Sequence, residues 1–199
     1  MNNTISIISS YPIYGKYSHT HSALASFTSN LVDGIKKNFP DLDISIYADR
    51  GELKQNTLDA HVSNLKIYRI WERNSLTSLA RMLSKLIVDP NKTLLFQYEW
   101  TLFGDSLLYN AFFLLALTLL RLRGKNCYVV FHGVIVGKSI VANLKKYKVL
   151  TPLKVLLLSI FSVPFYFLAS LLAKKIIVLE TDLKKQLVAF AYIDSSKIE

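Results

Sequence analysis

The chain has 199 residues, of which 51% are hydrophobic, and 24 Lys and Arg side chains against 14 Asp and Glu give it a net charge of +10. This length fits one large domain or two very small ones with a sizeable core, and the composition excludes disordered, collagen-like and disulfide-stapled chains. The single cysteine, Cys127, cannot form an internal disulfide and favours a reducing compartment. A basic chain with a positive mean hydropathy of +0.29 points to an anionic membrane surface before it points to nucleic acid.

Short apolar segments alternate with longer segments of helical periodicity along the chain. Strands are predicted at 4–9, 42–47, 65–70, 93–98, 126–131 and 175–179. Helices are predicted from Thr20 or Ser22 to 38, and at 75–88, 103–123, 138–148, 152–173 and 182–191. The polar segment 49–63 is a connection of uncertain shape. Strands that alternate with helices predict one α/β domain over 1–199, with a doubly wound, Rossmann-like parallel sheet.

The segment 155–173 contains 19 residues without a charge, which just reaches the length of a membrane span. Pro164 and three serines interrupt it, and a strand-like segment follows directly. A buried or interfacial helix is therefore the preferred interpretation. The first ten residues lack the basic start of a signal peptide and are predicted to form a strand.

The positive charge is concentrated in the second half of the chain. Residues 1–100 carry a net charge of +2 and residues 101–199 carry +8, with no acidic residue between Asp105 and Glu180. We expect the region 106–179 to bind an anionic membrane surface, which places the protein in the cytoplasm as a peripheral protein at the inner face of the membrane. A solvated basic face beside ordinary core helices is the alternative.

Several common catalytic motifs do not occur. The patterns G-x-G-x-x-G, G-x-x-x-x-G-K-[ST] and G-x-S-x-G are missing from the sequence, which removes the usual support for dinucleotide, P-loop and hydrolase functions. One cysteine and four scattered histidines give no zinc spacing, and His19 and His21 have no carboxylate near them in the sequence. We therefore expect no metal and no cofactor.

Ligands of parallel sheets bind at the carboxyl ends of the strands, so residues just after the predicted strands are the site candidates. His132 directly follows the strand 126–131 and can hydrogen-bond a hydroxyl, and Gly133 allows a ligand to approach the backbone. Glu99 lies between two aromatic residues, Tyr98 and Trp100, in an arrangement that suits a sugar. A structural histidine and a surface or capping carboxylate are the alternatives for His132 and Glu99.

The first predicted strand leads into a loop that contains Gly15 and Lys16. Backbone N–H groups and a lysine in such a loop, close to a helix N-terminus, can contact a phosphate. This pattern is short and common, so it is a weak indication alone.

At four places the order of strands, loops and helices resembles the N-terminal domain of a GT-B fold glycosyltransferase of the retaining family 4 type. These stretches are the opening strand with 25–31 (ASFTSNL), 96–100 (FQYEW) followed by Phe103 and Gly104, 128–133 (YVVFHG), and 176–180 (IIVLE) with 184–187 and 196–198. The resemblance extends over essentially the whole chain. It departs from the family at Ser22 and Ala23, where a Gly-Gly pair is frequent.

The resemblance implies a transferase that moves a sugar from a nucleotide sugar to a glycan or lipid-linked acceptor. His132 and Glu99 would be the catalytic residues, and the substrate-binding residues would be Gly15, Lys16, Ser22, Tyr98, Gly104, Gly133 and Glu180. The second domain of the family, which binds the donor, is absent from these 199 residues, so we expect it to be supplied in cis or in trans. We expect the chain alone to be inactive. The alternatives are a non-catalytic membrane-docking subunit of a split glycosyltransferase and, least favoured, a nucleic-acid-binding domain.

Overall fold

The computed structural model describes residues 4–13, 23–51, 57–62, 64–135 and 152–199. Seven strands form one sheet in the order β3-β4-β2-β1-β5-β6-β7. Their bounds are β1 Thr4–Ile8, β2 Asp43–Asp49, β3 Thr57–Val62, β4 Leu65–Trp71, β5 Thr93–Tyr98, β6 Asn126–Phe131 and β7 Lys175–Val178. Six strands pair in parallel, and only β3 runs antiparallel, at the edge beside β4. The predicted doubly wound α/β fold is confirmed.

Strand β3 lies in the segment that was predicted as a connection of uncertain shape. In the sequence, Thr57, Asp59 and His61 alternate with Leu58, Ala60 and Val62, which is the period-two pattern of a half-exposed strand. The pattern is short and carries one charge, as is common for edge strands. Strand β3 could therefore have been predicted from this alternation.

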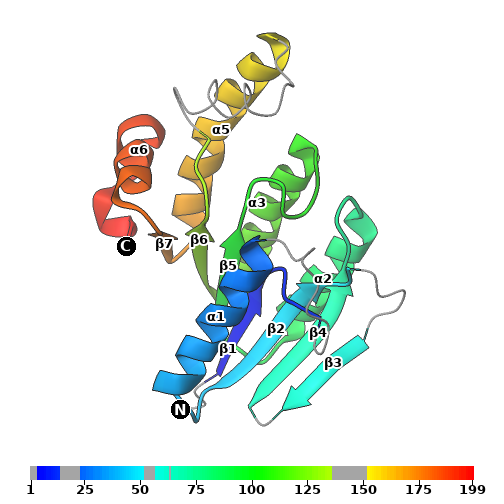
Figure 1. Ribbon diagram of the computed structural model, residues 1–199. Coiled ribbons are helices and arrows are strands. Elements are labelled where there is room, and N and C mark those ends of the chain that lie inside the picture. The colour runs from blue at the N-terminus through cyan, green and yellow to red at the C-terminus, as the bar shows by residue number, and fades with distance from the viewer. Residues whose placement is uncertain (1–3, 14–22, 52–56, 63, 136–151) are drawn as a thin grey trace.

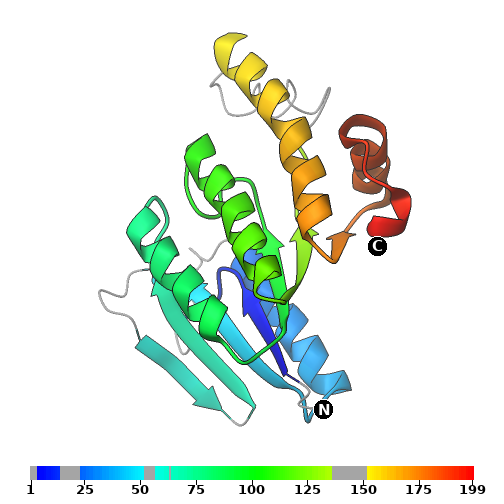
Figure 2. The same cartoon turned by 180° about the vertical axis from the view of Figure 1, so that it is seen from behind.

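Helices cover the two faces of the sheet unequally. The bounds are α1 Ala23–Asn38, α2 Leu76–Val88, α3 Leu107–Leu122, α5 Pro152–Leu172 and α6 Thr181–Ala191, followed by the short 3₁₀ helix η1 Ser195–Lys197. Helix α1 lies in front of the sheet in Figure 1, while α2, α3 and α5 lie behind it and come to the front in Figure 2. The helix predicted at 138–148 is outside the described residues.

One helix begins later than predicted, and the helix predicted at 152–173 is confirmed as α5. Helix α3 begins at Leu107 rather than at Phe103, because the Phe103 carbonyl oxygen accepts a hydrogen bond of 2.9 Å from the Asn74 backbone N–H and holds this segment in a loop. Helix α5 continues through Pro164. Within the part of the chain that the structure describes, no helix combines the length and the apolar character needed to cross a bilayer.

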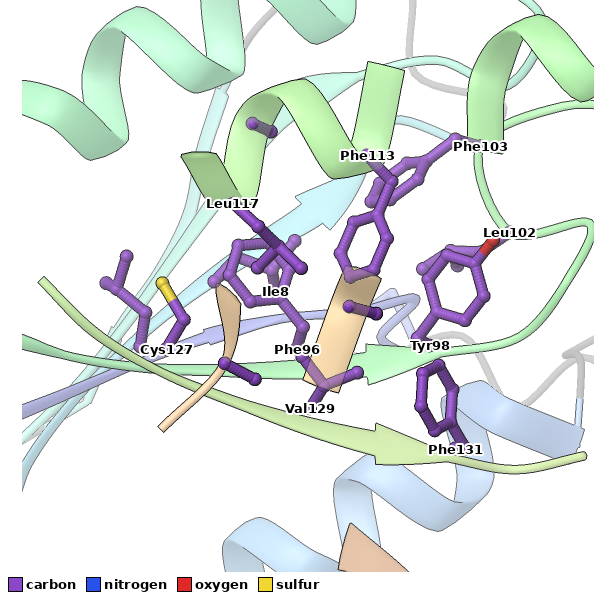
Figure 3. Close-up of a cluster of buried hydrophobic side chains, with 14 of the residues drawn as sticks. Ile8, Phe96, Tyr98, Leu102, Phe103, Phe113, Leu117, Cys127, Val129 and Phe131 are labelled. Atoms are coloured by element: carbon purple, nitrogen blue, oxygen red, sulfur yellow. The ribbon is translucent and has the colours of Figure 1, made fainter. Parts of the chain in front are cut away.

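The larger core lies between the sheet and helices α2, α3 and α5. Aromatic rings dominate it near the carboxyl ends of β5 and β6, where Tyr98 stacks on Phe113 with ring centroids 4.3 Å apart and meets Phe131 edge-on at 5.6 Å (Figure 3). Phe165 of α5 completes this group at 5.4 Å from Tyr98. Such rings bury large apolar areas in fixed geometry, so this core gives the carboxyl edge of the sheet a rigid support.

Candidate functional site

The topology of the sheet marks where a ligand site is expected. Strand β1 lies between β2 and β5. The chain leaves β1 through α1 on one face, and it reaches β5 through α2 on the other face. The connections therefore separate at β1 and β5, and in doubly wound sheets ligands bind at this switch point, outside the carboxyl ends of the strands.

His132 lies at this edge, directly after β6. Its backbone N–H donates to the Tyr98 carbonyl oxygen at 3.1 Å, which continues the pairing of β6 with β5 by one residue. Its Nε2 atom lies 2.6 Å from Oε1 of Gln97, and its ring meets Phe27 of α1 edge-on with centroids 4.7 Å apart. Partial burial lowers the pKa of His132 below its usual 6.5. The imidazole is therefore mainly neutral at neutral pH.

The contact with Gln97 also determines which ring nitrogen carries the proton. An amide oxygen can only accept, so the Nε2–H of His132 donates to Gln97 Oε1. In the neutral ring Nδ1 is then unprotonated and can accept a proton or a hydrogen bond. A positioned neutral imidazole of this kind can bind a hydroxyl or act as a general base.

Gln97 is a site residue that the sequence-based candidates did not include. Its side chain is fully buried, and its Nε2 atom has no hydrogen-bond partner in the described structure. A buried amide donor without a partner is unfavourable by about 1–3 kcal/mol, so such groups are expected to meet a ligand or water. The signal was in the sequence, because Gln97 is the one polar side chain within the apolar run 94–98 of a central strand.

The start of the loop between β1 and α1 is held by buried polar side chains. The guanidinium of Arg69 donates to the carbonyl oxygens of Tyr11 at 3.0 Å, Pro12 at 2.6 Å and Asp49 at 3.0 Å. The hydroxyls of Ser9 and Thr28 are 2.7 Å apart and join the end of β1 to α1. These contacts fix the backbone that leads into the predicted phosphate-binding loop.

Three predicted residues of this loop region, Gly15, Lys16 and Ser22, lie outside the described residues. The metal pair considered at His19 and His21 lies outside them as well.

A cavity of about 340 Å³ opens beside this anchored loop, at the carboxyl ends of β2 and β4. Burial raises the pKa of Asp49, although Ser10 and Arg69 act in the opposite direction. The Asp49 Oδ1 atom and the Arg50 Nε atom are buried and have no hydrogen-bond partner in the described part of the chain. The lining residues are Ser10, Asp49, Gly51, Trp71, Glu72, Arg73 and Leu102. Within this cavity the Asp49 carboxylate therefore offers an acceptor to a polar ligand.

The loop after His132 is held from the opposite face of the sheet. The backbone N–H of Ile135 donates to the Tyr166 hydroxyl at 3.0 Å, and this hydroxyl lies 3.5 Å from the Gly133 carbonyl oxygen. A Cβ atom added at Gly133 would meet no heavy atom of the described residues within 4 Å. The space beside Gly133 is open, as the predicted close approach of a ligand requires.

Other predicted residues have different surroundings. Tyr98 is only 1% exposed and points into the aromatic core (Figure 3), on the opposite face of the sheet from Gln97. This position leaves no room for the predicted contact with substrate, and the physical reason is the alternation of side chains along a strand. Glu99 is exposed, and among the described residues no hydrogen bond joins it to His132.

Gly104 and Glu180 have structural surroundings. A Cβ atom on Gly104 would lie 2.3 Å from the Tyr109 ring and 2.6 Å from Asn74 Oδ1, so the glycine allows a tight packing contact. Glu180 is the N-cap residue of α6, and its carbonyl oxygen accepts from the backbone N–H of Leu183 at 3.1 Å.

The described residues include no group of three or more His, Cys, Asp or Glu side chains that could hold a metal ion. In the comparisons with known proteins, no family model matches the chain and no curated protein is similar to it. The functional argument therefore rests on the geometry of the carboxyl edge.

Proposed function

We propose that this chain is the acceptor-side domain of a glycosyltransferase that moves a sugar from a nucleotide sugar to a glycan or lipid-linked acceptor. The observation that carries the proposal is the His132–Gln97 pair at the switch point of a doubly wound parallel sheet. The resemblance of four stretches of the sequence to retaining GT-B enzymes supports the same function. The donor-binding domain is supplied in cis or in trans.

His132 binds a substrate hydroxyl through its unprotonated Nδ1 atom, while Gln97 holds the ring through Nε2. Burial lowers the His132 pKa and keeps the ring neutral. The unprotonated Nδ1 atom can therefore accept a hydrogen bond from the substrate hydroxyl. The free Nε2–H donor of Gln97 supplies a second contact to an oxygen atom. The backbone at Gly133 lies beside the substrate, because no side chain of the described residues fills that space.

The second part of the proposal places the protein at the inner face of the membrane, in the cytoplasm. Leucines at positions 108, 115 and 122 of α3 are 56%, 52% and 77% exposed, and their spacing of seven puts them on one line of the helix. Exposed apolar side chains of α5 are Ile160, Phe167, Leu168 and Leu171.

Helices α3 and α5 lie side by side in both views of the fold (Figures 1 and 2). Exposed Arg121 and Arg123 flank Leu122 at the end of α3, and the Arg121 guanidinium donates to the Leu171 carbonyl oxygen. An apolar surface next to cationic side chains suits an anionic bilayer.

The experiment is turnover of a panel of nucleotide sugars by the protein together with its donor-binding domain, with membrane lipid extract as acceptor. Release of nucleoside diphosphate with labelling of the lipid or glycan supports the proposal. No turnover with any donor contradicts it. If the chain binds vesicles while a separate polypeptide catalyses transfer without it, the non-catalytic docking subunit is the correct function instead.

A further inference from the structure

A second cavity, of about 670 Å³, lies at the amino ends of the strands, far along the sheet from His132. It opens on the α2 side of the sheet. There β2 and β4 extend past the C-terminal end of α2 (Figure 2). The volume is within the range of small-molecule sites, which is about 300–1,000 Å³. The proposed catalytic function does not involve this cavity.

The floor of the cavity is unusually polar for a central parallel sheet. Ser45 of β2 and Lys66 of β4 are register partners on this floor, and both line the cavity. Such strands are normally apolar on both faces because helices cover them. Ser45 is half-buried and Lys66 is exposed, so this part of the face contacts water or a polar ligand.

A buried network keeps the frame of the cavity rigid. Asp89, at the end of α2, accepts hydrogen bonds on Oδ2 from the Ser6 hydroxyl at 2.7 Å and from the Tyr47 hydroxyl at 2.8 Å. Its Oδ1 accepts from the Asn91 backbone N–H at 2.9 Å, and the Asn91 side chain donates to Ser6 at 2.9 Å. Lys125 Nζ donates to the Asn91 carbonyl oxygen at 3.0 Å. The network joins four separate segments, so the cavity is pre-formed.

An aromatic platform forms one side of the cavity. The rings of Tyr47 and Tyr68 are stacked with centroids 5.3 Å apart and an interplanar angle of 23°. Tyr47 is buried, and Tyr68 is half-exposed toward the cavity that it lines. A half-exposed ring with a fixed orientation offers a flat surface to the C–H groups of a ligand, at little conformational cost.

The charges of the lining are balanced, which distinguishes between classes of ligand. Lys66 and Lys92 are offset by Asp43 and Asp89, so the cavity has no excess charge that would select an anion. Hydroxyl and amide groups of Thr4, Ser45 and Asn64 add donors and acceptors in the same space. A flat ring surface beside hydrogen-bonding groups whose charges balance matches a neutral sugar unit.

We infer that the cavity lined by Ser45, Lys66 and Tyr68 is a binding site for a neutral saccharide unit, separate from the carboxyl edge. The site rests on its own residues and does not require the proposed glycosyltransfer reaction. It would hold a glycan while leaving the His132 edge free.

The test is calorimetric titration of the purified chain with neutral oligosaccharides, namely cellotriose, maltotriose and chitotriose, and with inorganic phosphate as the anionic probe. We expect at least one trisaccharide to bind with a Kd on the order of 1 mM and phosphate to bind more weakly. Tyr68→Ala removes the platform and should raise the Kd about tenfold. Ser45→Ile, which fills the polar floor with a residue favoured in strands, should do the same and protects the test against a folding defect in the first variant.

Two controls separate this site from other surfaces. Tyr128→Ala changes a half-buried tyrosine on the other face of the sheet, and Ser84→Ala changes an exposed residue of α2. Both should leave the Kd unchanged. The inference is overturned if no trisaccharide binds, or if Tyr68→Ala and Ser45→Ile both bind as well as the wild type. Preferential binding of phosphate overturns the assignment to a saccharide. The titration measures binding and not sugar transfer. Saccharide binding at the cavity can therefore be detected even if the protein transfers no sugar.

Discussion

The Nε2 atom of His132 lies 2.6 Å from the Oε1 atom of Gln97, and this contact joins the ends of two adjacent parallel strands. Neither side chain belongs to the core that packs against α2, α3 and α5. Their sequence neighbours Phe96, Tyr98 and Phe131 do belong to it. The pair therefore combines a rigid support with a nitrogen atom that stays available to a ligand.

Acid should destabilise the folded chain partly through His132. Its folded pKa is below the unfolded value of 6.5, so the unfolded state binds a proton more readily in the window between the two values. The contribution of this group is complete above the unfolded pKa and is lost as the pH falls through the folded pKa. We expect the urea midpoint of the wild type to fall more than that of His132→Gln between about pH 7.5 and about pH 5. Equal decreases in the two proteins would show that His132 does not titrate in this way.

Two glycines should respond oppositely to alanine. Gly133→Ala should leave the melting temperature unchanged, because the added Cβ meets open space, yet it should weaken substrate use if a ligand approaches the backbone there. Gly104→Ala places a Cβ against the Tyr109 ring and should destabilise the fold by about 1–3 kcal/mol. Thermal melting and turnover of both variants measure the two effects. A stable Gly104→Ala protein would contradict the packing role.

Arg69 should be essential to the fold around the first loop. Replacing it by Met removes three hydrogen bonds to backbone carbonyl oxygens, and we expect a loss of stability of about 3 kcal/mol. Arg81→Met is the matched control, because Arg81 is exposed on α2 and its loss should change stability by less than about 0.5 kcal/mol. Chemical unfolding compares the two. Similar stability of both variants would mean that water replaces the guanidinium without loss.

Vesicle binding should depend on the apolar line of α3. The double change of Leu115→Gln and Leu122→Gln removes exposed leucines and should reduce sedimentation with vesicles that contain phosphatidylglycerol. Val88→Gln is the control, because Val88 is 78% exposed on a different helix. Salt should weaken binding of the wild type, since charges are screened beyond about 10 Å at about 0.1 M. Equal binding to vesicles of phosphatidylcholine alone would contradict the electrostatic part of the proposal.

Much of the fold could be predicted from the chain because central parallel strands are continuous apolar runs. The run from Leu94 to Tyr98 is an example, and its only polar residue, Gln97, turned out to lie at the site. Strand β3 was missed because an edge strand needs only a weak alternation.

The site was harder to predict because its contacts join distant segments. Arg69 binds the carbonyl oxygen of Tyr11, which is 58 residues away in the sequence, and no local pattern encodes that contact. Tyr98 was assigned to the substrate from its neighbour Glu99, but the alternation of side chains places the Tyr98 ring in the core beneath the sheet. The ends of the predicted strands identified the region of the site. Only the structure shows the face of the sheet to which each side chain points.

The most direct measurement is the rate of sugar transfer by the protein with its donor-binding domain, for the wild type and for His132→Ala. A positioned acid–base or hydroxyl-binding group contributes about a hundredfold or more, so the variant should lose at least that factor while its circular dichroism stays native. Ser84→Ala, on the exposed surface of α2, serves as the control and should keep the full rate. A folded His132→Ala protein that transfers sugar at the wild-type rate would contradict the proposal that the His132–Gln97 pair binds the substrate.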